Sequence, residues 1–104
     1  MTDSNGRDLG TLSVERVEGE LLLGTFTPGA DYPAVRSIFD GFAEAVEYGA
    51  LSVVDDFDRR ISALGIRVTL GDRVMPAHDV QIYPDGAASC RVPLTGLNGA
   101  IKSV

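Results

Sequence analysis

His78, Asp79 and Cys90 are the residues of this chain whose chemistry could support catalysis, as a thiol nucleophile with an imidazole base and a carboxylate. The expected strand geometry argues against this arrangement, because adjacent residues of a strand point to opposite faces and Asp79 could not easily orient His78. Cys90 falls on the buried face of its expected strand, where burial raises the pKa of a thiol and makes it unreactive. We therefore predict a core thiol and no catalytic residue, and we favour a non-enzymatic role.

Asp55, Asp56 and Asp58 form the densest charged cluster, and several adjacent carboxylates could bind a hard divalent cation. Their spacing favours a plainer role, because Asp55 and Asp56 precede Arg59 and Arg60 by four residues. On a helix this spacing forms ion pairs of about 0.2–0.5 kcal/mol each. No second acidic motif accompanies the cluster, and no motif for a dinucleotide or a phosphate is present. The sequence thus predicts no metal and no cofactor.

The charge and composition of the chain exclude several classes of partner. Of its 104 residues 15 are acidic and 9 basic, and the basic residues are scattered apart from Arg59-Arg60. Binding to nucleic acid or to an anionic membrane requires clustered Lys and Arg, so neither is expected. The longest apolar run is residues 21–23, which is too short to span a bilayer. The single cysteine and the polar residues 1–8 favour a cytoplasmic protein.

A long amphipathic segment from about Asp31 to Leu64 is the main feature of the pattern, with apolar residues recurring at three- and four-residue steps. We expect Asp31 to cap its N-terminus. One continuous helix of this length would measure roughly 50 Å, which exceeds the width of a compact domain of about 100 residues. Gly49 is the expected kink or break, because glycine costs about 1 kcal/mol relative to alanine inside a helix.

Two sets of residues in this segment could form an interface. Leu51 and Val54 fall off the apolar stripe of a continuous helix, so they would be exposed or would face a partner. If the helix bends at Gly49, we expect both to join the core instead. A ridge of small residues also steps by four along the segment, and it permits either a helix–helix contact in a dimer or close packing on the sheet, which we favour. The ridge comprises Ser37, Gly41, Ala45 and Gly49.

Alternating apolar residues predict antiparallel strands on both sides of the helical segment. Before it, residues 9–17 and 21–27 form a hairpin whose loop holds two or three residues. After it, residues 66–70 form a strand, and Gly71-Asp72 forms a two-residue turn into residues 73–75. Pro76 then interrupts the pairing.

The last hairpin has a defined register. Residues 78–83 and 87–94 flank Pro84-Asp85-Gly86, which suits a three-residue loop with Gly86 in a left-handed conformation. Pairing Tyr83 with Ala87 sets this register, and the pairs on the buried face are then Ile82 with Ala88, Val80 with Cys90, and His78 with Val92. The polar face then pairs Gln81 with Ser89 and Asp79 with Arg91. This register places Cys90 in the core.

Together the elements predict a two-layer α+β sandwich, in which one long helix or two consecutive helices cover one face of a small antiparallel sheet. The sheet holds about four or five strands in the order ββαβββ. We expect a flexible leader at residues 1–6, a single domain at residues 7–94, and a loosely docked or frayed tail at residues 95–104.

The surplus apolar surface predicts a small protein–protein interaction domain that self-associates as a homodimer, with another protein partner as an open possibility. Its candidate interface comprises Leu51, Val54, Gly41, Ala45 and Gly49. The alternative is a small-molecule-binding or catalytic domain that uses the polar sheet face. The candidate contacts on that face are Arg67, Gln81, Tyr83 and Arg91.

Overall fold

The computed structural model describes residues 1–93 and 102–104. A short 3-10 turn, η1 (Tyr32–Ala34), leads into the helices α1 (Arg36–Glu47) and α2 (Leu51–Ala63). The strands, in chain order, are β1 (Gly10–Glu18), β2 (Leu21–Pro28), β3 (Arg67–Leu70), β4 (Arg73–Pro76), β5 (His78–Ile82) and β6 (Ala87–Arg91). Residues 94–101, which include most of the predicted tail of residues 95–104, lie outside the described residues.

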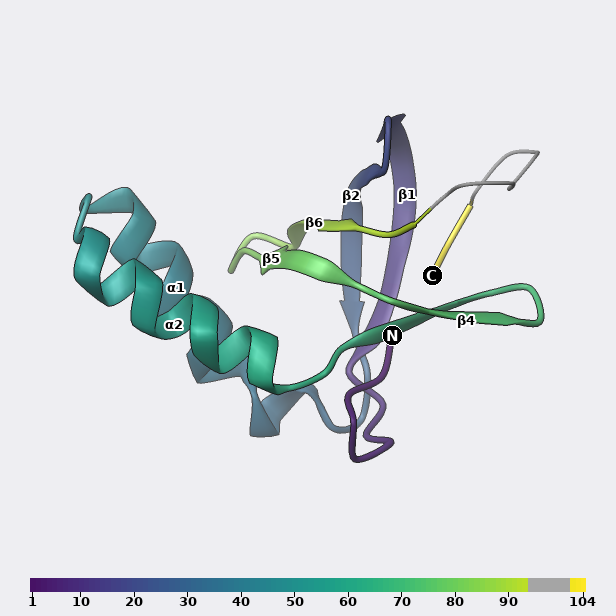
Figure 1. Cartoon of the computed structure of the whole chain (residues 1–104), viewed down its shortest axis with the longest axis horizontal. Helices are drawn as coiled ribbons and strands as arrows, with labels where there is room; N and C mark the ends of the chain where they lie inside the picture. Colours follow the sequence, from purple (N-terminus) through teal and green to yellow (C-terminus); the bar gives the residue numbers. More distant parts are fainter. Residues whose placement is uncertain (94–101) are drawn as a thin grey trace.

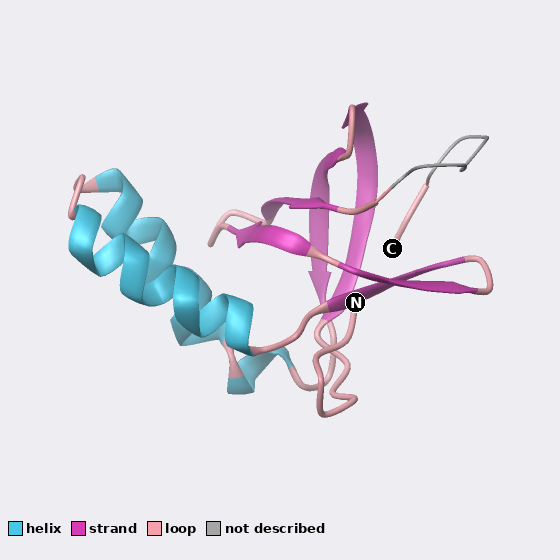
Figure 2. Ribbon diagram, in the orientation of Figure 1, coloured by secondary structure: helices cyan, strands magenta, loops and turns pink. Residues whose placement is uncertain are grey.

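The strands form a four-stranded antiparallel sheet in the order β1-β2-β6-β5 and a separate antiparallel pair, β3-β4 (Figures 1 and 2). The two helices lie side by side as a hairpin and pack against the larger sheet through its edge strand β5. This arrangement confirms the predicted α+β class. It differs from the expectation in one respect, because β3 pairs with β4 through the Gly71-Asp72 turn and stays outside the larger sheet.

The core lies between the helical hairpin and the inner face of the larger sheet. Phe39 of α1 and Ile61 of α2 belong to the same buried cluster as Leu22 of β2. Residues on β2, β5 and β6 alternate between this cluster and the opposite face, as the period of a strand requires. The buried residues that the larger sheet contributes to this cluster are Leu12, Leu22, Phe26, Val80, Ile82, Ala88 and Cys90.

The chain reverses direction at Gly49, which has a φ of +68° and separates α1 from α2. The predicted break is therefore confirmed. Val54 packs against the core after the break, as expected, but Leu51 is 76% exposed and that part of the expectation is wrong. Leu51 is the first residue of α2, at the end of the hairpin that extends beyond the sheet (Figure 1).

Gly41, from the ridge of small residues on α1, faces α2, which neither of the two interpretations from the sequence anticipated. The backbone of Gly41 lies so close to the ring of Phe57 that a methyl group on Gly41 would overlap the ring. Ala45, one turn further along, is also buried. Gly41 therefore allows α2 to pack closely against α1 within the same chain, and Gly41 and Ala45 are not available to a second copy.

Replacing Gly41 by Ala tests this contact. Alanine favours a helix by about 1 kcal/mol over glycine, but overpacking costs about 1–3 kcal/mol. We expect the overlap to dominate, so that Gly41→Ala lowers the free energy of unfolding measured in urea. In the double variant Gly41→Ala/Phe57→Leu the smaller side chain should recover part of the loss. A single variant at least as stable as the wild type would contradict the contact.

Asp31 does not cap α1, so that prediction is wrong. The helix begins at Arg36, because the 3-10 turn of residues 32–34 comes first, and the cap position is Val35, which has no side-chain hydrogen bond to the helix. The Asp31 carboxylate instead accepts a hydrogen bond of 2.9 Å from the backbone N–H of Asp8.

Residues 1–6 pack against the fold, in contrast to the flexible leader expected from their polarity. Thr2 and Arg67 exchange two backbone hydrogen bonds of 2.9 and 2.7 Å, which extend the edge of β3. Asp3 is buried and accepts hydrogen bonds from the backbone N–H groups of Asn5 and Arg7 and from Nε of Arg7. Burial raises the pKa of Asp3, but these hydrogen bonds more than offset it, so the pKa falls below its ordinary value.

The described end of the chain also pairs with the sheet. The backbone N–H of Val14 donates to the carbonyl of Lys102, and that of Val104 donates to the carbonyl of Leu12. These bonds satisfy part of the exposed edge of β1. Residues 102–104 thus dock on β1, and Val104 is buried.

The structure defines the strand registers of both hairpins of the larger sheet. Glu18 pairs with Leu21, so the first loop holds two residues. In the second hairpin Ile82 pairs with Ala88 and Gln81 with Ser89, as predicted. The predicted pairing of His78 with Val92 is wrong, because an irregularity between His78 and Gln81 shifts His78 opposite Arg91.

Candidate functional site

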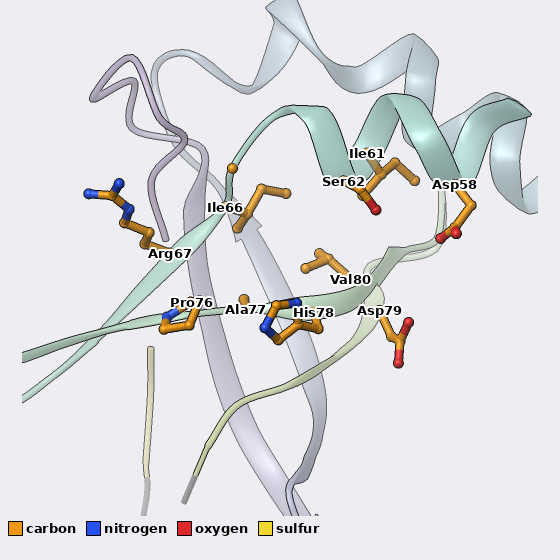
Figure 3. Close-up of a pocket in the computed structure, with 11 residues that line it drawn as sticks. Asp58, Ile61, Ser62, Ile66, Arg67, Pro76, Ala77, His78, Asp79 and Val80 are labelled. Carbon is orange, nitrogen blue, oxygen red and sulfur yellow. The ribbon is translucent and has the colours of Figure 1, made fainter.

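A cleft of about 330 Å³ lies between the C-terminal half of α2 and the segment that enters β5 (Figure 3). Ile61 and Ile66, both buried, supply apolar wall, together with Val80 on β5. The polar side chains that line the cleft are Asp58, Ser62, Arg67, His78 and Asp79. The cleft therefore gathers the one histidine of the chain, two carboxylates, a hydroxyl and a guanidinium.

Asp79 determines the direction in which the His78 side chain points at this cleft. It has a φ of +50°, the one positive φ at a described residue other than glycine, and it sits in the irregular part of β5. Without this bulge His78 would follow Val80 and Ile82 onto the buried face. The bulge turns His78 outward, so that its imidazole stays exposed while Val80 remains in the core. Asp79 then forms an exposed ion pair of 3.2 Å with Nε of Arg91.

The polar side chains that line the cleft are not joined to one another by any hydrogen bond or ion pair of the described residues. His78 is exposed, and no carboxylate of the described residues accepts a hydrogen bond from its imidazole. Such a partner often holds a catalytic base in its orientation toward a nucleophile. No three metal-ligating side chains of the described ranges, 1–93 and 102–104, come together either. Asp56 forms ion pairs with Arg60 at 3.1 Å, as predicted, and with Arg59 at 3.6 Å.

Cys90 is fully buried on the inner face of β6, as its register predicts. Burial raises the pKa of its thiol to about 11. At pH 8 this shift leaves a thiolate fraction of about one in a thousand, whereas an ordinary thiol of pKa about 8.5 is roughly one quarter ionised. The sulfur is thus neither accessible nor ionised, and it belongs to the core.

We expect thiol labelling of the folded protein at pH 8 to be slower by a factor of about 100 or more than labelling in denaturant. A Cys90→Ser/Ala87→Cys variant supplies the control, because Ala87 lies on the same strand and is exposed. That thiol should react rapidly in the folded protein. Equal rates for Cys90 and for the control thiol would contradict the burial of Cys90.

The polar face of the larger sheet brings together only part of the predicted contact set. Gln81 and Tyr83 line a groove of about 550 Å³ with Ser89 and Arg16, on the face away from the helices. The Tyr83 hydroxyl donates to Oε1 of Gln81 over 2.5 Å. Arg67 is not on this face, because β3 belongs to the other sheet and Arg67 lines the cleft near α2. Arg91 is held at the end of β6 by its ion pair with Asp79.

The closed end of the helical hairpin carries most of the exposed apolar surface. Six large apolar side chains are exposed among the described residues, and four of them lie within residues 46–53. Tyr48 and Leu51 are each 76% exposed. We call this set the hairpin tip, and it comprises Val46, Tyr48, Leu51 and Val53.

The sequence pattern identified only one member of the hairpin tip. Val46 and Val53 follow the apolar period of their helices and were expected in the core, whereas both are about half exposed. The sequence signal for this exposure is the excess length of the helical segment, because helices longer than the sheet must leave one end uncovered. Gly49 forms the turn between the two helices at the tip, and Val54 is partly buried against the core.

No helix within the described residues is both long and apolar enough to cross a membrane. Comparison of the chain with models of known families, with curated proteins and with solved structures gave no significant match.

Proposed function

We propose that this chain is a small non-enzymatic interaction domain that self-associates as a homodimer through the hairpin tip. The observation that carries the proposal is the exposure of Tyr48 and Leu51 at the end of a hairpin that projects past the sheet (Figure 1). Burying a side chain such as leucine contributes roughly 1.5–3 kcal/mol. Exposed apolar side chains gathered at one end of a molecule are typical of a protein-binding site.

The charges along α2 favour a second copy as the partner. The acidic residues Asp55 and Asp56 come before the arginines Arg59 and Arg60 in the helix. A two-fold axis perpendicular to α2 would set the two copies of the helix antiparallel. In that orientation the acidic part of each helix can approach the arginines of the other where the overlap extends beyond the tip to residues 55–60. Two-fold self-association is also the commonest form of oligomer. Another protein with an apolar surface and a basic rim is the alternative partner.

The small size of the hairpin tip sets the expected strength of the dimer. A stable interface buries about 800 Å² on each partner, which four side chains at one end of a hairpin do not supply. We therefore expect a dissociation constant of about 10–100 μM. We place this weak dimer in the cytoplasm, because the one cysteine is a buried free thiol that needs no oxidising compartment.

Sedimentation equilibrium from about 1 to about 300 μM tests the proposal, since this range brackets the expected dissociation constant. The wild type should shift from monomer to dimer as its concentration rises, and Leu51→Glu should remain monomeric. Val74→Glu is the matched control, because Val74 is also exposed but lies on β4, away from the tip. A monomeric wild type throughout, or equal loss in both variants, would contradict self-association through the tip.

A small-molecule site on the polar sheet face is the second proposal, and the groove of about 550 Å³ beside Gln81 and Tyr83 supports it. A ligand there should raise the melting temperature, since a ligand at 100 times its Kd adds about 2.7 kcal/mol of stability. The variant Gln81→Ala should remove that shift, while Ser62→Ala in the cleft near α2 should not. A metabolite panel that shifts neither the wild type nor the Ser62→Ala protein would count against this site.

A further inference from the structure

A cavity of about 440 Å³ lies between the start of α1 and the turn that joins β5 to β6. It is apart from the hairpin tip and shares Tyr83 with the groove on the polar sheet face. Tyr32 and Arg36, from η1 and the first residue of α1, line one side. Tyr83 and Pro84 line the side formed by the β5–β6 turn. The cavity is thus closed by parts of the chain that are distant in sequence.

Tyr32 is almost completely buried, yet its hydroxyl has no partner in the described part of the chain. Its side chain is 3% exposed, and its ring packs 4.9 Å from that of Phe26 and 6.0 Å from that of Phe39. Every fully buried polar side-chain atom among the described residues has a hydrogen-bond partner. The Tyr32 hydroxyl makes no such bond, so it must be the part of the side chain that reaches the surface, and the cavity is the surface that Tyr32 lines.

Folding does not require this hydroxyl, which water can satisfy where it reaches the surface. A phenylalanine at position 32 would fill the same aromatic cluster, and replacing an unpaired hydroxyl by an apolar group costs little or no stability. Burial and the nearby Asp40 raise the pKa of Tyr32 to about 12, although Arg36 opposes the shift. The phenol therefore stays protonated at neutral pH and acts as a hydrogen-bond donor toward the cavity.

Arg36 supplies a second hydrogen-bond donor beside the Tyr32 hydroxyl. Its guanidinium carbon lies 5.5 Å from the centre of the Tyr32 ring, and no carboxylate of the described residues comes within 4.0 Å of it. Arg36 also begins α1, whose cap residue Val35 offers no side-chain oxygen and whose first turn contains no acidic residue. The positive end of the helix dipole is thus left uncompensated at the same place.

We infer that this cavity binds a small ligand with a single carboxylate on an aromatic or apolar ring. The carboxylate would accept hydrogen bonds from the Tyr32 hydroxyl and the Arg36 guanidinium, two donors suited to it. The ring would rest on Tyr83 and Pro84. Asp40 and Asp85 also line the cavity, so two carboxylates face one guanidinium and oppose any anion, a dianion such as phosphate most strongly. The class is therefore limited to monoanions, and the apolar ring of the ligand must supply part of the affinity.

Titration with benzoate, followed by backbone amide chemical shifts, tests this inference. Benzoate is small, so we expect a dissociation constant of about 1 mM. Shift changes should map to residues 32–40 and 82–86 and should saturate. Tyr32→Phe and Arg36→Gln should each weaken binding about tenfold or more, as expected for a lost hydrogen bond to a charged group. Asp40→Asn should strengthen binding, because it removes a negative charge beside the carboxylate.

Two further probes decide the chemical class. Benzamide should bind more weakly than benzoate, and benzylamine should not bind. The inference is overturned if benzoate gives no saturable shifts, if benzylamine binds instead, or if Asp40→Asn weakens binding. Tyr32→Phe should also unfold at the same denaturant concentration as the wild type, and unchanged benzoate affinity in that folded variant would remove the role of the hydroxyl. None of these outcomes depends on self-association.

Discussion

The ring of Phe57 lies over the backbone of Gly41, and this contact between α2 and α1 is the constraint on which the other features of the molecule depend. It holds the two helices side by side after the reversal at Gly49. The paired helices cover the inner face of the sheet with Phe39 and Ile61 but extend past its edge. The close helix packing and the exposed hairpin tip are thus two consequences of one helical segment that is longer than the sheet it covers.

The edge strand β5 carries both buried apolar side chains and a polar side chain that points away from the core. Val80 and Ile82 remain buried beside Cys90, while the bulge at Asp79 turns His78 out toward water. A bulge on an edge strand also discourages pairing with another chain. The opposite edge, β1, is partly satisfied by residues 102–104. The exposed helical tip is therefore a more natural place for self-association than either edge of the sheet.

Much of the fold could be predicted from the sequence wherever local chemistry determines the structure. Gly49 broke the helix as expected, and the turn before Gly86 fixed the pairing of Ile82 with Ala88 and the burial of Cys90. The features that were missed depend on contacts distant in sequence. Arg67 is not on the polar face because β3 pairs with β4 and with Thr2 rather than with the larger sheet, and Val46 is exposed because the sheet ends before α1 does. The cavity beside Tyr32 forms only when η1 meets the β5–β6 turn.

Self-association through the hairpin tip is the central claim, and intermolecular nuclear Overhauser effects test it most directly. A mixture of isotope-labelled and unlabelled protein, at a concentration about ten times the dissociation constant, would contain enough mixed dimer for isotope-filtered spectra. Self-association through the hairpin tip predicts intermolecular signals from the Leu51 methyl groups to Val46, Tyr48 or α2 of the other copy. Signals that arise instead from Val74 on the β3-β4 hairpin, or no intermolecular signals at all, would contradict it.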